Sequence, residues 1–249
     1  MSAAQLREDP VEEARRVVEA ADEAGLTVRQ IGGTAIWEHA ETVRDGHFER
    51  DYRDVDFVGT TAEEDEIVDL MQDLGYESNV RFNTMRRFRL EFLDEANERK
   101  ADFILDRFEF CHAWSLADRL DLDHPTIPIE DLLLSKMQIV EPSDRDIRDV
   151  VAMLTDHPVE ASDDTEVIDP TYVASLCRGD WGLYKTLTMN VDRIEEYLGN
   201  HETPVDEATI TDRLEAIRTE IESEPKTLRW KLRSLIGERK QWYQKPELT

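Results

Sequence analysis

Two groups of residues in the first quarter of the chain have the types and spacing needed for phosphate and metal chemistry. The first is a glycine pair followed by a hydroxyl residue: Gly32, Gly33 and Thr34. The second is a pair of acids, Asp54 and Asp56, which flank one valine inside an apolar run. Alternate residues of a strand point to the same face, so we expect the two carboxylates side by side. Such a pair repels unless it holds a cation, and Mg²⁺ is the oxygen-preferring ion that suits it.

The glycine pair supplies the complementary half of a reaction site. We expect it at the start of a helix, where free backbone N–H groups bind phosphate well. A phosphate cradle beside metal-binding carboxylates is the equipment for phosphoryl or nucleotidyl transfer.

Several elements must position these groups. The pattern predicts a strand over 27–31, a helix from Gly33 to about Val43, and a second strand whose Val55 and Phe57 face the core. Helices are predicted over 11–24 and 62–74, an edge strand over 80–82, and strands over 84–92 and 101–105 joined by a hairpin over 94–98. Asp102 and Asp106 have the same parity, so either can supply a third carboxylate.

The second half of the chain reads as helical. Helices are predicted over 129–140, from about 145 to 154, after Asp169-Pro170, and over 180–198, 204–222 and 226–243. The polar, acidic stretch 157–166 separates them into a first domain, 1–157, and a C-terminal all-helical domain, 167–249. The predicted fold class is α/β (α+β): a mixed sheet flanked by helices, followed by a helical segment.

The glycine and aspartate pattern resembles the signature of the nucleotidyltransferase (polymerase-beta-like) superfamily. That signature is an apolar residue, Gly-Gly-Ser/Thr, a spacer and Asp-apolar-Asp. Arg50, four residues before Asp54, resembles the AbiEii-type branch associated with toxin–antitoxin systems. The apolar helix with one lysine, Lys136, and the following stretch with Asp146 and Asp149 are similar to segments of that branch. The resemblance covers about residues 25–155.

The resemblance implies a role for each matched residue. Asp54, Asp56 and Asp102 would be the catalytic acids and the ligands of two Mg²⁺ ions. The nucleotide would be bound by Gly32, Gly33, Thr34, Arg50 and Lys136. The context of Asp102 favours it over Asp106 as the third acid. Lys136 has an alternative interpretation, in which it extends from an apolar helix to solvent, and Asp146 and Asp149 suit an ordinary helix surface equally well.

The composition limits the setting in which the protein works. The net charge is −27, with seven lysines against 23 arginines. Acid-rich, lysine-poor surfaces suit a high-salt cytosol, where screening removes most self-repulsion, so we expect a halophilic, cytoplasmic protein. No apolar run is long enough to cross a membrane. The two cysteines, Cys111 and Cys177, have no metal-ligand spacing and are interpreted as ordinary thiols.

The C-terminal residues 225–249 carry a charge of +5, which leaves −32 for the preceding 224 residues. This basic tail contains Trp230, Trp242 and Tyr243. It suits an RNA partner, through phosphate pairing and base stacking. Alternatively, it is a last helix that neutralises the acidic body of its own protein.

The histidines show no zinc motif in the sequence. His39 lies on the predicted helix after the glycines, where it reaches the site or lies in an ordinary surface or core position. His112, His124, His157 and His201 are scattered and lack zinc-ligand spacing.

The main hypothesis is an Mg-dependent nucleotidyltransferase that moves a nucleoside monophosphate from an NTP to a hydroxyl acceptor. The acceptor would be an RNA 3′ end, a protein or a small molecule, and the enzyme would be the toxin of a toxin–antitoxin pair. The alternative is a catalytically silent binding module of the same fold, such as the antitoxin partner. Tyr52, where a Ser or Thr is expected, and the long spacer before Asp54 motivate that alternative.

Overall fold

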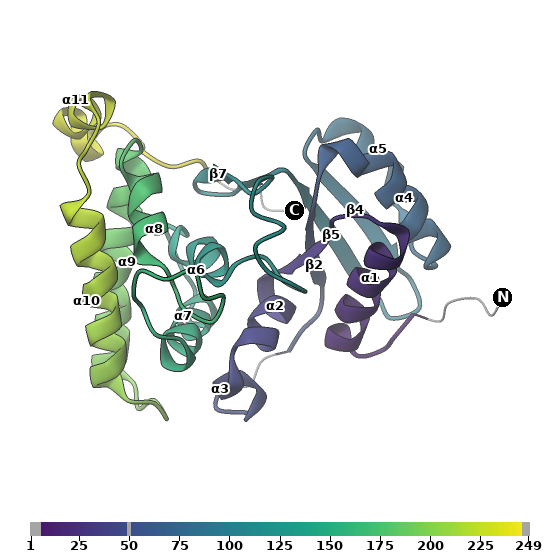
Figure 1. Cartoon of the computed structure of the whole chain (residues 1–249), viewed down its shortest axis with the longest axis horizontal. Helices are drawn as coiled ribbons and strands as arrows, with labels where there is room; N and C mark the ends of the chain where they lie inside the picture. Colours follow the sequence, from purple (N-terminus) through teal and green to yellow (C-terminus); the bar gives the residue numbers. More distant parts are fainter. Residues whose placement is uncertain (1–5, 49–50, 246–249) are drawn as a thin grey trace. The chain divides into compact units, whose positions relative to one another are not determined.

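The computed structural model describes residues 6–48 and 51–245, which divide into two compact units (Figure 1). The first unit contains the described residues of 1–38, 49–108 and 115–128, and the second contains those of 39–48, 109–114 and 129–249. Residues 129–157 therefore group with the helices that follow them. The domains 1–157 and 167–249 stay a prediction.

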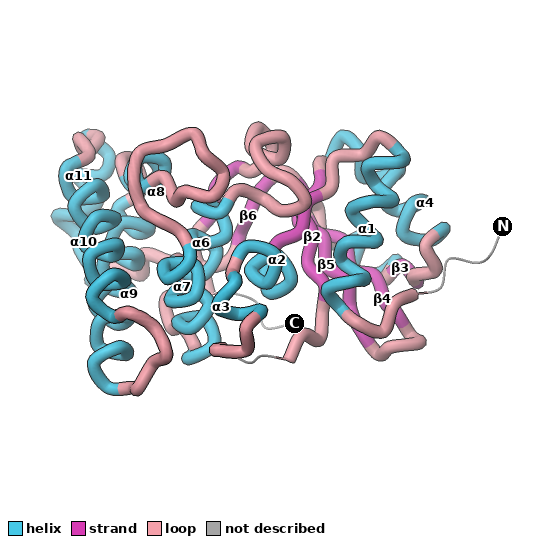
Figure 2. The backbone as a smooth tube through the Cα atoms, turned by 60° about the horizontal axis from the view of Figure 1, so that its bottom comes forward, coloured by secondary structure: helices cyan, strands magenta, loops and turns pink. Residues whose placement is uncertain are grey.

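The first unit is built on a mixed five-stranded sheet with the order β1-β2-β5-β4-β3 (Figure 2, magenta). Its strands are β1 (Arg29–Ile31), β2 (Val55–Gly59), β3 (Glu77–Ser78), β4 (Arg89–Asp94) and β5 (Arg99–Leu105). β2 and β5 pair in parallel, whereas the other neighbours are antiparallel. The predicted mixed sheet is confirmed.

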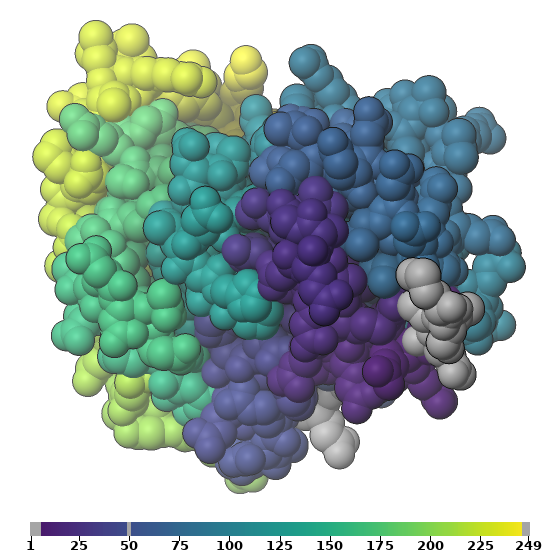
Figure 3. Space-filling view, turned by 45° about the vertical axis from the view of Figure 1, so that its right-hand side comes forward, coloured from purple at the N-terminus to yellow at the C-terminus, as the bar shows by residue number. Residues whose placement is uncertain are grey.

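Two amphipathic helices, α1 (Pro10–Ala24) and α4 (Glu64–Asp73), cover one face of this sheet. Atoms of α1, purple, lie against the blue atoms of the α4 region in Figure 3. The Asp9 side chain caps α1 by accepting hydrogen bonds from the N–H groups of Val11 and Glu12, and Gly25 ends it in the left-handed conformation. The core between helices and sheet includes Val17, Phe57 and Phe103.

Three smaller helices belong to the first unit: α2 (Gly32–His39), whose last residue His39 is grouped with the second unit, α5 (Val80–Met85) and the 3₁₀ helix η1 (Thr61–Glu63). The helix predicted to run from Gly33 to Val43 is interrupted because Ala40 is extended, and α3 (Glu41–Arg44) begins after it. Two short strands, β6 (Arg107–Glu109) and β7 (Ala113–Ser115), lie where the chain passes between the units.

The region 80–92 differs from its prediction. Residues 80–82 belong to α5 and are not an edge strand, and the strand predicted over 84–92 is confined to β4. The side chain of Asn79 accepts a hydrogen bond from the N–H of Phe82 and so initiates a helix. Val80 and Met85 are exposed, whereas Leu90 and Phe92 are buried, so the apolar alternation marked a buried face only within β4.

The second unit is almost entirely helical, as predicted for its C-terminal part. Its helices, besides α3, are α6 (Ile129–Met137), α7 (Asp144–Asp156), α8 (Pro170–Cys177), α9 (Trp181–Asn200), α10 (Glu207–Ser223) and α11 (Leu228–Ile236), followed by the 3₁₀ helix η2 (Gly237–Arg239). Asp180 and Thr227 cap α9 and α11 with their side chains. Fully buried residues of α9 and α10, such as Leu187 and Leu214, contribute to its core. Among the described residues, none of the helices has the length and apolar character needed to span a bilayer.

The aromatic residues of the basic tail pack within the second unit. The ring of Trp242 meets that of Trp181 edge to face, and its Nε1 donates a hydrogen bond to Thr186. Trp230 packs edge to face on Tyr184. These contacts favour the interpretation in which the tail serves its own protein, while an RNA partner stays a prediction.

Candidate metal- and phosphate-binding site

Asp56 and Asp102 lie directly opposite each other on neighbouring strands. The parallel pairing of β2 and β5 puts Asp56 beside Asp102, and the antiparallel pairing of β4 puts Glu91 on the other side of Asp102. The flanking residues Val55 and Phe57 are fully buried in the core. Because side chains alternate along a strand, the acids share the face opposite α1 and α4.

Asp54 joins this group from the residue before β2. The backbone N–H of Lys100 donates a hydrogen bond to Asp54 Oδ1 at 3.3 Å, which holds the carboxylate against the start of β5. Asp54 is exposed, whereas Asp56 and Asp102 are half-buried. The structure therefore brings the three predicted acids to neighbouring positions, with Asp56 and Asp102 on paired strands and Asp54 just before β2. Their catalytic and metal-binding roles stay predictions.

Burial and neighbouring charges act on the acids of this face. Burial raises the pKa of Asp102 above its ordinary value, Arg89 and Lys100 oppose this effect, and Glu91 and Asp54 add to it. A hydrogen bond to Glu91 raises the pKa of Lys100, whose Nζ lies 2.8 Å from Glu91 Oε2. Burial alone would raise the pKa of Glu91, but hydrogen bonds from Lys100 and Asn79 lower it.

Gly32 lies against the carboxylate of Asp56. Its φ is +75°, and a Cβ atom built there would be only 2.6 Å from Asp56 Oδ2. Only glycine suits both the backbone conformation and the close approach. Gly33 and Thr34 follow in the first turn of α2, as predicted, so their N–H groups start a helix beside the acids. The Thr34 hydroxyl is buried and makes no hydrogen bond to the described residues.

Asp106, the rival third acid, has a structural role. β5 ends at Leu105, and Asp106 adopts a left-handed backbone conformation with φ of 59°. Its carboxylate accepts hydrogen bonds from the N–H and the hydroxyl of Thr61, at the start of η1. Asp102 is therefore the acid that shares a face with Asp56.

Lys136 lies in the second unit and is ion-paired there. Its Nζ is 2.9 Å from Asp149 Oδ2 and 3.3 Å from Asp146 Oδ1, and only 13% of its side chain is exposed. Lys136 is therefore not a lysine that extends from an apolar helix into solvent, which was the alternative interpretation of the sequence. Its predicted contact with nucleotide phosphates is untested, and Arg50 lies outside the described residues.

Two charged neighbours of the acids, Glu91 and Lys100, were not expected from the sequence. In the sequence, Glu91 is one of several polar residues in an alternating stretch. Its position beside Asp102 follows from the register of β4 and β5, which the sequence spacing does not contain. Lys100 precedes Asp102 by two residues, so parity along the strand was a signal that pointed to the same face.

Comparisons with known proteins provide little further information. No protein-family model and no curated protein matches the chain. Among solved structures, the chain is similar to the solution structure of the antibiotic-resistance factor ANT(2″)-Ia, with 14% identity and a TM-score of 0.38. The match covers 57% of this chain and 80% of that one. The functional assignment therefore depends on the acids and the glycines.

Proposed function

We propose that the protein is an Mg-dependent nucleotidyltransferase that transfers a nucleoside monophosphate from an NTP to a hydroxyl acceptor. The observation that carries the proposal is the pairing of Asp56 with Asp102 across β2 and β5, with Asp54 held beside them. Carboxylates at this density on one sheet face suit a divalent cation, because oxygen ligands are those that Mg²⁺ prefers. Bound there, Mg²⁺ would neutralise phosphate charge and make an acceptor hydroxyl easier to deprotonate.

The chain's own residues supply the remaining functions. The N–H groups of Gly33 and Thr34, in the first turn of α2, suit binding of the triphosphate. The acceptor oxygen would form a bond to the α-phosphorus while the bond to the pyrophosphate oxygen breaks. Asp102, opposite Asp56 on the neighbouring strand, is the residue proposed to accept the acceptor's proton. The proton thus leaves the hydroxyl as pyrophosphate departs.

The acceptor is proposed as a class only: an RNA 3′ end, a protein side chain or a small molecule that carries a hydroxyl group. A toxin of the AbiEii type, paired with an antitoxin protein, is the setting that the sequence resemblance supports. The proposal assigns no role to Asp106 or to Trp242 of the basic tail, because Thr61 and Trp181 are their structural partners.

Transfer of a labelled nucleotide tests the proposal directly. Purified protein is incubated with each α-³²P-labelled NTP, Mg²⁺ and high salt, with cell RNA, with cell protein or with aminoglycosides. We expect label on one acceptor class, and its loss with Asp56→Asn and Asp102→Asn. Asp69→Asn, an exposed acid on α4, is the matched control and should retain activity. Equal labelling by the Asp56 variant would refute the assignment, and tight Mg-NTP binding without turnover would favour the silent binding module.

A further inference from the structure

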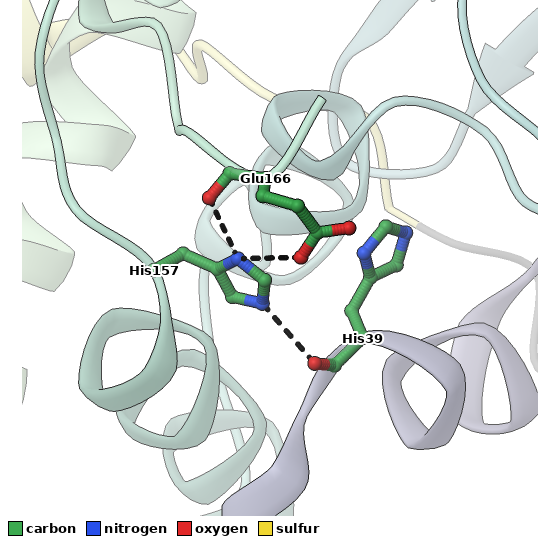
Figure 4. A group of neighbouring side chains, drawn as sticks. All are labelled: His39, His157 and Glu166. Carbon is green, nitrogen blue, oxygen red and sulfur yellow. Dashed lines mark hydrogen bonds and ion pairs between the residues drawn. The ribbon is translucent and has the colours of Figure 1, made fainter. Parts of the chain in front are cut away.

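A second group of potential metal ligands lies in the second unit, made of His39, His157 and Glu166. Each residue offers one ligand atom, and these atoms lie within 4.8 Å of one another. Figure 4 shows the Glu166 carboxylate between the two imidazole rings. His39 ends α2, His157 follows α7, and Glu166 lies in the loop before α8. We refer to these three residues as the His-His-Glu cluster.

The ring of His157 is surrounded by hydrogen-bond acceptors. Its Nε2 lies 3.2 Å from the carbonyl oxygen of His39, and its Nδ1 lies 2.9 Å from the carbonyl oxygen of Glu166. The Glu166 carboxylate is 3.5 Å from the same Nδ1. A neutral imidazole has one N–H donor, and carbonyl oxygens only accept. One ring nitrogen of a neutral His157 therefore directs its lone pair at an oxygen atom, and a metal ion bound to that nitrogen would relieve this unfavourable contact.

The backbone around the cluster is fixed from both sides. Thr42, close after His39, donates hydrogen bonds from its N–H and hydroxyl to the Asp156 carboxylate, adjacent to His157. The loop that carries Glu166 is closed by backbone hydrogen bonds from Glu160 N to Ile168 O and from Ile168 N to Pro158 O. The cluster is thus held together by contacts outside the three side chains, as a preformed metal site requires.

One separation within the cluster can be compared with the geometry of a zinc-type ion. Zn²⁺ binds imidazole nitrogen and carboxylate oxygen at about 2.1 Å, so two ligands of a tetrahedron lie ~3.4 Å apart. The separation of His157 Nδ1 and Glu166 Oε2, 3.5 Å, is close to that edge. If Nε2 donates its proton to the His39 carbonyl, as metal-bound histidines commonly do, the lone pair of Nδ1 can bind a metal ion in place of its 2.9 Å contact with the Glu166 carbonyl oxygen.

We propose that His39, His157 and Glu166 form a binding site for one Zn²⁺ ion or a similar divalent transition metal. The ligands are the Nδ1 of His157, a ring nitrogen of His39 and a carboxylate oxygen of Glu166. A fourth position is left for water or an added ligand. Access is provided by Glu166, whose side chain is 68% exposed, whereas that of His157 is 4% exposed. Two imidazoles distinguish this site from the all-carboxylate site on the sheet, which suits Mg²⁺.

Cobalt and zinc titrations of the full-length protein test this site. We expect one equivalent of Co²⁺ to give visible d–d absorption, and Zn²⁺ to displace it. His157→Gln and His39→Gln should each weaken Zn²⁺ binding at least tenfold in calorimetry. For the wild type, lowering the pH from 7.5 to 5.5 should also weaken Zn²⁺ binding, because protons compete with the metal ion for imidazole nitrogens. His124→Gln, an exposed histidine of the first unit, should bind like the wild type.

Two further measurements make the outcome decisive. Asp56→Asn should leave Zn²⁺ binding unchanged, which separates this site from the proposed Mg²⁺ site. Histidine ring NMR signals of the wild type, followed during Zn²⁺ addition, need no variant to fold, and two rings should shift together with 1:1 stoichiometry. If no histidine signal responds to Zn²⁺, or if His157→Gln binds Zn²⁺ as tightly as the wild type does, the metal site is refuted.

Discussion

The backbone of Gly32 lies so close to the carboxylate of Asp56 that no side chain fits between them. A Cβ atom at position 32 would be 2.6 Å from Asp56 Oδ2. The start of α2 and the acid on β2 are therefore packed as one assembly. A phosphate bound at this helix start would lie next to a cation bound by the acids, which is what nucleotidyl transfer requires.

Gly32→Ala tests this close packing, with Gly25→Ala as its matched control. Both glycines have nearly the same positive φ, +75° and +76°, but nothing lies within 4 Å of a Cβ atom at Gly25. Left-handed backbone strain should cost each variant about 1 kcal/mol of unfolding free energy. Gly32→Ala should lose roughly 1–3 kcal/mol more through the clash. Urea unfolding measures both, and equal losses would contradict the geometry.

The raised pKa of Asp102 predicts a pH-dependent effect of Asp102→Asn on stability. Burial is the main cause, so the folded state retains the proton to a higher pH than the unfolded state does. Wild-type stability contributed by this group therefore falls as the pH rises from the unfolded pKa through the folded pKa. In Mg-free buffer, Asp102→Asn and the wild type should have the same unfolding free energy at the acid end of this window. At pH 7 the unfolding free energy of Asp102→Asn should be the larger of the two. Chemical denaturation at several pH values between 3.5 and 7 measures this, and a variant less stable than wild type at pH 7 would contradict it.

The ion-paired Lys136 predicts a large difference between two substitutions. Lys136→Met leaves Asp146 and Asp149 without their cation in a largely buried setting, which should cost about 3 kcal/mol of unfolding free energy at pH 7. Lys136→Arg keeps the charge and should cost clearly less. Lys136 and hydrogen bonds from Ser143 lower the pKa of Asp146, against the effect of burial. The stabilisation that ionised Asp146 contributes is therefore present above the pKa of Asp146 in the unfolded chain. It is lost as the pH falls through the lower pKa that Asp146 has in the folded protein. Guanidinium unfolding of both variants measures the loss of unfolding free energy. Equal losses for Lys136→Met and Lys136→Arg would show that the positive charge at position 136 does not stabilise the fold.

The net charge of −27 predicts a strong dependence of stability on salt. Screening shortens the Debye length from about 10 Å at 0.1 M to about 3 Å at 1 M, which removes most repulsion between surface acids. The unfolding temperature should therefore rise between 0.1 M and 2 M KCl. Calorimetry measures it, and sucrose at matched water activity controls for general osmolyte effects. An unfolding temperature that does not change with KCl concentration would contradict the interpretation that the acidic surface is an adaptation to high salt.

Strand alternation was sufficient to predict that Asp56 lies on the face opposite the buried Val55 and Phe57, because period-two patterns depend only on neighbouring residues. The partner of Asp56 across the sheet required the register, which sequence spacing does not contain. The prediction failed at α5, where a short apolar stretch gave the same signal as a strand and the capping side chain of Asn79 decided the outcome. Local patterns also gave no indication that His39 and His157 are neighbours, because they come from distant parts of the chain.

The parallel pairing of β2 with β5 also affects how this protein can change over evolution. Parallel neighbours need a long crossover, and residues 60–98 form it here with η1, α4, β3, α5 and β4. Insertions in its exposed turns would leave Asp56 opposite Asp102, whereas a one-residue slip of β5 would send the second acid to the opposite face. The turns of the crossover can thus change in length and sequence while the pair of acids that it joins keeps its alignment.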